Sequence, residues 1–359
     1  MTKLVITPRH LPVIWHYTSN RDTASQSHRF LKATLDLAVN PGEILGLLSK
    51  CNVVGVTQLR LEKSTNPTTS PDFMECAVAD VCKKFPSATE LEITSMVGNL
   101  QGTVLSSFVT RLVHLTLHVA FEPLATVVDL SFEVLETLVI VDRRMASSSL
   151  TFLPSGFQFF SRVASLILAP HLQELCLVGN LRQHLLPVRA LIRKFSSSIT
   201  KLGLLEDDTP DNYSHLQLPP LPRLRTLIVE CSWAHAAVHR IGVLPQTLPL
   251  LEQVVLQADI NFIYAGMTAI HWDTFFDGMH ALENRVEVIQ LEIRGESRGI
   301  EGSFQSVFMD RVSEHHAQSK ISSFRIEEGF ALSFPEPAEV AKSNSWDNLR
   351  GGSPGWRSR

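Results

Sequence analysis

The sequence is short of several features that mark common classes of protein. Its five cysteines are an odd number, with no C-x-x-C pair and no zinc-finger spacing, so neither a disulfide framework nor a cysteine-based metal site is indicated. Reduced thiols suit a cytoplasmic or nuclear protein. The first residues contain no long apolar run, which argues against a signal peptide or a membrane span. We therefore expect a cytoplasmic or nuclear protein that does not bind membranes.

Strong charge and catalytic motifs are also missing. The net charge is −4 and the lysines and arginines are scattered, which gives no basic footprint for nucleic acid. The chain has no G-x-S-x-G, no P-loop and no G-x-G-x-x-G. We therefore predict a protein that is not an enzyme, with no catalytic residues, no cofactor and no metal ligands.

One short pattern, apolar-x-x-Leu-x-Leu or a near variant, recurs along most of the chain. Leu112, Leu115 and Leu117 form one copy. The central pairs of the copies are Leu35/Leu37, Leu59/Leu61, Leu91/Ile93, Leu115/Leu117, Leu138/Ile140, Leu175/Leu177, Leu202/Leu204, Leu227/Val229, Val254/Leu256, Ile289/Leu291 and Phe324/Ile326. Most of the steps between them lie near the ~20–29-residue period of leucine-rich repeats.

The spacing within the pattern predicts a parallel sheet. In a strand the two leucines point to one face and the residue between them to the other. A single unit cannot bury its apolar face, whereas stacked units bury a continuous core. An extra match at Val163, Leu166 and Leu168 lies too close to Leu175 for a full repeat and indicates an insertion or a distorted half-turn.

Helices are predicted between the strands. Apolar residues at near-helical spacing occur in residues 41–50, 73–85, 272–282 and 304–312, each between two strand motifs. The order of strand and helix predicts an α/β leucine-rich-repeat solenoid, a horseshoe of about 11 irregular repeats with helices on its convex side. We assign residues 1–30 to an N-terminal cap or irregular segment, 31–334 to the solenoid and 335–359 to a disordered tail.

The chain resembles the irregular leucine-rich-repeat proteins of the mushroom-type fungal F-box family. The resemblance is carried by F-P-S-A-T-E-L-E-I at residues 85–93, A-P-H-L-Q-E-L-C-L at 169–177 and P-L-P-R-L-R-T-L at 220–227. It implies target recognition for an SCF-type ubiquitin ligase. The chain departs from the family because no F-box is recognisable, the nearest echo being N-P-G-E-I-L at residues 40–45. A scaffold or inhibitor unrelated to ubiquitin, or a hydrolase with its site in inserted loops, remains an alternative.

Side chains that flank each apolar pair are predicted to line the concave face. They are polar near the N-terminal end, with Arg60, Glu92 and His118 among them. Further along the chain they become apolar and form a candidate surface for a protein partner: Val139, Val141, Cys176, Val178, Leu205, Ile228 and Val255. Two alternatives stay open, namely that these residues only reflect strand propensity, or that a loop such as residues 206–222 covers them.

Histidines in the polar part of that face raise the question of a metal site. His114 and His118 share a strand face, and Glu90 and Glu92 are predicted one strand away. A solvated polar surface is the interpretation that the pattern favours. His235 and His239 have helical i, i+4 spacing, but no third ligand is evident near them in the sequence.

Overall fold

The structure is a computed structural model that describes the chain in segments. They are residues 2–7, 30–37, 39–51, 53–62, 74–94, 104–118, 129–142, 155–179, 181, 185–205, 218–230, 248–259, 286, 288–294 and 323–326. The chain divides into two compact units, the first formed by Met1–Ser232 with Val243–Leu251 and the second by Trp233–Gly242 with Glu252–Arg359. Each unit is described by itself.

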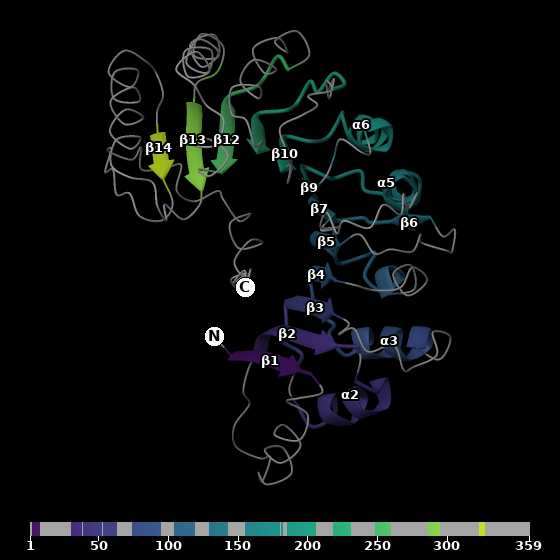
Figure 1. The fold of residues 1–359 in the computed structure, drawn as a ribbon. Helices are drawn as coiled ribbons and strands as arrows, with labels where there is room; N and C mark the ends of the chain where they lie inside the picture. Colours follow the sequence, from purple (N-terminus) through teal and green to yellow (C-terminus); the bar gives the residue numbers. More distant parts are fainter. Residues whose placement is uncertain are drawn as a thin grey trace. The chain divides into compact units, whose positions relative to one another are not determined.

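The first unit is an α/β structure with a large, open parallel sheet (Figure 1). Its strands follow one another in chain order: β1 (Thr2–Ile6), β2 (Phe30–Asp36), β3 (Gln58–Glu62), β4 (Glu90–Ile93), β5 (His114–His118), β7 (Thr137–Asp142), β9 (Glu174–Gly179), β10 (Lys201–Leu205) and β11 (Thr226–Glu230). The helices α2 (Pro41–Leu48), α3 (Met74–Lys83), α5 (Ser155–Leu166) and α6 (Leu185–Lys194) lie on one side of these strands. The short strands β6 (Leu130–Ser131) and β8 (Ile167–Leu168) pair separately from the sheet.

The second unit contains three described strands: β12 (Gln253–Asp259), β13 (Val288–Arg294) and β14 (Ser323–Ile326). They are parallel and pair in chain order, as the strands of the first unit do. Parallel neighbours need a crossover rather than a hairpin. The predicted helical stripes at 272–282 and 304–312 lie outside the described residues, as does the tail at 335–359.

The apolar pairs stand in register from β3 to β11. Leu59 lies opposite Leu91, Leu91 opposite Leu115, and the alignment continues through Leu138, Leu175, Leu202 and Leu227. These leucines are at most 2% exposed. Complete burial of one such side chain contributes about 1.5–3 kcal/mol. The pairs therefore form the core between the sheet and the helices.

A tight turn and a shared carbonyl precede most strands of the first unit. The turn closes by a backbone hydrogen bond from residue i+3 to residue i, as from Ala88 to Phe85 and from Leu172 to Ala169, both 3.2 Å. Just after the turn, one backbone carbonyl accepts two hydrogen bonds. The donors are the N–H group of the residue before the next strand of the sheet and the N–H group of that strand's first residue. The accepting carbonyls belong to Thr57, Thr89, Val113, Glu136, Gln173 and Thr200. For example, Thr57 accepts from Thr89 and Glu90, both at 3.0 Å.

Local sequence signals explain the first helices. Asn40 caps α2, because its side-chain oxygen accepts the backbone N–H of Gly42 at 2.8 Å and Pro41 begins the helix without needing a partner for its nitrogen. In α3 the buried residues Val78, Val81 and Cys82 follow helical spacing. The predicted helices at 41–50 and 73–85 are thereby confirmed within the described residues.

The predicted alignment with the neighbouring strand was wrong by two residues at β2 and at β14. Leu35 aligns with Leu61 and Ala33 with Leu59, so the first pair is Ala33/Leu35 rather than Leu35/Leu37. Likewise Phe324 aligns with Leu291, not with Ile289. A shift of two residues keeps the same side chains on the same face, so the apolar pattern cannot distinguish the two registers.

The extra match at Val163 is not a strand of the main sheet. Val163 and Leu166 are buried residues of α5, and Ile167 and Leu168 form β8.

Near the start of the chain, β1 pairs with β2 and brings residues 2–6 to the edge of the sheet. Among the described helices, none is long and apolar enough to cross a membrane.

Candidate functional site

The face of the first unit's sheet that points away from the helices presents three rows of side chains. Among the described residues no helix lies on it, and we call it the helix-free face. The leading row contains the residue just before each buried pair. The middle row contains the residue between the two members of the pair, and the trailing row contains the residue just after it. The middle row, for example, consists of Thr34, Arg60, Glu92, Thr116, Val139, Cys176, Gly203 and Ile228. Neighbours in a row are about 4.8 Å apart, so adjacent side chains lie within reach of one another.

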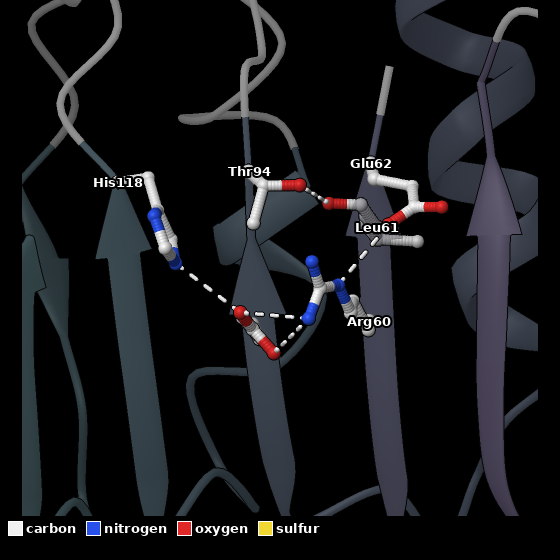
Figure 2. A network of polar contacts seen from close by, with 6 residues as sticks. Arg60, Leu61, Glu62, Thr94 and His118 are labelled. Carbon is white, nitrogen blue, oxygen red and sulfur yellow. Dashed lines mark hydrogen bonds and ion pairs between the residues drawn. The ribbon is translucent and has the colours of Figure 1, made fainter. Parts of the chain in front are cut away.

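The part of this face on β3, β4 and β5 is a polar network (Figure 2). Arg60 donates from Nε to Glu62 Oε2 at 3.1 Å, and its Nη1 lies 3.4 Å from Glu92 Oε1 on the next strand. Glu92 Oε1 also lies 3.1 Å from Nε2 of His118, one strand further on. Since Arg60 is 45% exposed and Glu92 26%, each ion pair contributes only about 0–1 kcal/mol.

Further polar contacts surround this network. Gln58 donates from Nε2 to Glu90 Oε2 at 2.7 Å, which joins β3 to β4 in the leading row. Thr94 is buried, and its hydroxyl donates to the carbonyl of Leu61 at 3.2 Å. His114 is exposed. The polar section of the face therefore comprises Gln58, Arg60, Glu62, Glu90, Glu92, His114, Thr116 and His118.

Six of the seven predicted partner-binding residues come together on the helix-free face. Val139 lies opposite Cys176, Val141 opposite Val178, and Val178 opposite Leu205. Ile228 follows in the middle row, across Gly203. Val255 is on β12 in the second unit, where it lies opposite Gln290.

These apolar side chains are buried. Val139 and Val141 are each 4% exposed, Cys176 1%, Leu205 6% and Ile228 3%, and only Val178 is of intermediate exposure. Little of this part of the face is therefore open to solvent, and the burial does not separate the alternatives left open by the sequence. Partner binding by these residues stays a prediction. The suggested cover at 206–222 lies largely outside the described residues.

Two features of the apolar section were not foreseen from the sequence. A Cβ atom on Gly203 would lie 2.9 Å from Sγ of Cys176, so the glycine makes room for its neighbour. Lys201 and Glu174 approach to 3.6 Å in the leading row, although Lys201 is only 9% exposed. The sequence contains a signal for both features, because Lys201 and Gly203 stand beside the leucines of a pair and interrupt an otherwise apolar run.

Groups with possible metal-binding or nucleophilic chemistry occur on this face and elsewhere in the described residues. The structure does bring Glu92 and His118 together, as the sequence predicted. Within the described ranges, however, no three His, Cys, Asp or Glu side chains converge on a point where a metal ion could be held. Burial raises the pKa of the Cys82 thiol to about 12 against an opposing effect of Arg111, and raises the pKa of Cys51 as well. Neither thiol is therefore activated as a nucleophile.

Comparison with known proteins assigns no family. A scan against protein-family models found no matching model, and a search of the curated proteins found no significant match.

Proposed function

We propose that this chain is an irregular leucine-rich-repeat solenoid that binds another protein through the helix-free face and has no catalytic activity of its own. The observation that carries the proposal is the recurrence of one local geometry. An in-register apolar pair returns from β3 to β11, and a tight turn and a doubly accepting carbonyl accompany most of these strands. A unit that contacts mainly its neighbours in the chain is the property that defines repeat architectures.

The helix-free face supports binding as the role of this architecture. Its alternate side chains stand in continuous rows, and in the polar section several of them reach solvent. Arg60 and Glu92 contact one another across β3 and β4 and offer charged groups to a partner at the surface. A broad surface that carries several polar groups is suited to protein recognition rather than to chemistry.

Target recognition for an SCF-type ubiquitin ligase is the more specific form of the proposal, and it rests on the family resemblance alone. A scaffold or inhibitor unrelated to ubiquitin would use the same face. The two are separated by purifying the chain from its own cells and probing for ligase adaptors. Recovery of an adaptor in stoichiometric amount supports the ligase role, and its absence beside a recovered partner supports the scaffold. The cytoplasmic or nuclear location belongs to the proposal as well, and fluorescence microscopy of the tagged chain tests it.

Site-specific photo-crosslinking tests the proposed binding face. A benzoylphenylalanine is placed at His114, which is exposed in the polar section, and in a matched variant at Lys84, which is exposed beyond the end of α3. Both full-length chains are irradiated in their native cells, and the adducts are identified by mass spectrometry. We expect protein adducts at position 114 that are absent at position 84. The absence of an adduct at 114, or the same adducts at both positions, would overturn the proposal.

A further inference from the structure

We infer that Lys194 is a charge-dependent latch that holds the end of α5 against α6 in the longest repeat of the first unit. That repeat covers residues 138–174 and contains α5 and β8, since 37 residues separate Leu138 from Leu175. The inference concerns how this repeat is held together, and it does not depend on the proposed binding face. Removal of the positive charge should loosen α5 locally while the parallel sheet stays intact.

The junction after α5 differs from the ends of the other described helices. Each of α2, α3 and α6 is followed by a turn in which a backbone N–H donates back to the helix, as from Lys50 to Leu47 at 3.0 Å. Leu166, the last residue of α5, is followed directly by β8, whose residues Ile167 and Leu168 pair with β6. The last carbonyl groups of a helix have no partner inside it. At the end of α5 a donor from another element can therefore take the place of a closing turn.

Lys194, in the last turn of α6, supplies such a donor. Its ammonium group donates to the carbonyl of Ala164 and, at 3.5 Å, to the carbonyl of Ser165. Both carbonyls belong to the last turn of α5, where the helix dipole favours a positive charge. The ammonium also lies 5.8 Å from the centre of the buried Phe195 ring, within range of a cation–π contact. One side chain thus joins two helices that are neighbours on the same side of the sheet (Figure 1).

The surroundings of Lys194 make its charge costly without these acceptors. Burial lowers the pKa of Lys194, and the carboxylate of Asp129 opposes that shift. Asp129 stands just before β6, the strand that pairs with β8, so its charge also acts at this junction. The adjacent cation on α6, Arg193, is exposed. Of the two basic side chains at the end of α6, only Lys194 therefore connects its charge to α5.

Hydrogen exchange of the full chain, read by mass spectrometry of peptides, tests the latch. Lys194→Met keeps a long side chain but removes its charge and its donors, whereas Lys194→Arg keeps both. We expect Lys194→Met to speed exchange at residues 160–169 by about threefold or more, because a hydrogen bond from a charged group is lost at a partly exposed site. Lys194→Arg should stay closer to wild type. Arg193→Met, at the exposed neighbouring position, is the matched control and should leave exchange at residues 160–169 unchanged.

Four results overturn the inference. Exchange at residues 160–169 could be unchanged in Lys194→Met, equally fast in Lys194→Arg, or equally fast in Arg193→Met. The fourth is an increase of the same size in peptides of β3 and β4, which would mean a loss of global stability rather than the release of one helix. If circular dichroism shows that Lys194→Met does not fold, Lys194→Gln repeats the test with an uncharged donor. Faster exchange at residues 160–169 in that variant supports the latch, and unchanged exchange overturns it.

Discussion

Gly203 and Cys176 lie opposite one another on β10 and β9, and the sulfur of Cys176 occupies the space that a side chain on Gly203 would need. A Cβ atom at position 203 would come within 2.9 Å of that sulfur. In most strands glycine is unfavourable relative to alanine, because it packs nothing and loses more chain entropy on folding. At this position the balance is reversed by the neighbouring thiol.

Gly203→Ala should therefore destabilise the protein, by about 1–3 kcal/mol as expected for overpacking. Cys176→Ala removes Sγ and leaves a 3.4 Å contact with Cβ of residue 176, so the cost of Gly203→Ala should fall in that background. Urea unfolding of both single variants and the double variant measures the coupling. An equal cost of Gly203→Ala in both backgrounds would show that the sulfur is not the obstacle.

Cys82 should resist thiol reagents in the folded protein, whereas Cys51 should react faster. Burial raises the pKa of Cys82 from the ordinary 9.0 to about 12, so almost no thiolate exists near neutral pH, and its side chain is inaccessible. Cys51 has a raised pKa too, but it is partly exposed. Pulse labelling with iodoacetamide, read by mass spectrometry of peptides, compares the two rates. Faster labelling of Cys82 under native conditions would contradict the burial.

The same pKa shift predicts how stability depends on pH. A thiol whose folded pKa is raised contributes its full stability below the unfolded pKa near 9.0, and the contribution is lost as pH rises towards 12. Wild-type protein should therefore lose more stability than Cys82→Ala between about pH 9 and pH 11. Urea midpoints at several pH values measure the difference, and parallel curves for the two proteins would refute the prediction.

Asn40→Ala should cost about 1 kcal/mol, because the cap on the Gly42 N–H is lost at the start of α2. Asn40→Asp keeps an oxygen acceptor at the same place and adds a negative charge at the helix N-terminus, so it should be close to neutral. Thermal unfolding followed by circular dichroism distinguishes the two variants. Similar losses in both would indicate that the amide nitrogen of Asn40, not its oxygen, has the structural role.

Leu91 and Glu92 are consecutive residues on opposite faces of β4, and substitution should reveal the difference. Leu91→Ala removes a side chain that is 2% exposed and should cost about 2–5 kcal/mol. Glu92→Gln keeps the shape, disturbs the partly exposed ion pair with Arg60 and the contact with His118, and should cost less than about 1 kcal/mol, less still in high salt. Comparable costs would mean that the polar section is part of the folding core.

Much of the sheet could be predicted from the sequence, because burial of one face imposes a two-residue period that leucines make visible. The pairs from Leu59 to Leu227 were placed correctly for this reason. At β2 the sequence offers Ala33, Leu35 and Leu37 in alternation, and the buried pair could not be chosen without the hydrogen bonds to β3. Hydrogen-bond register is a non-local property that side-chain polarity does not encode.

The sequence predicted which residues belong to the helix-free face, but it did not predict how exposed their side chains are. Alternation identifies Val139, Cys176 and Ile228 as side chains that point away from the helices. Whether they meet solvent depends on what lies above them, and that is decided by tertiary contacts. The contact between Arg60 and Glu92 required the register of two strands that are 32 residues apart in sequence.

The doubly accepting carbonyls have a consequence for how such a chain can change its length. Thr57 accepts from Thr89 and Glu90, and Thr89 accepts from Val113 and His114 in the same way. Excision of residues 58–89 would present the carbonyl of Thr57 with the same pair of donors that Thr89 now receives. Successive strands from β4 to β11 are therefore joined to their neighbours by the same kind of backbone connection. That connection is kept although the segments between these joints differ in length, from the 23-residue step of Leu115 to Leu138 to the 37-residue step of Leu138 to Leu175.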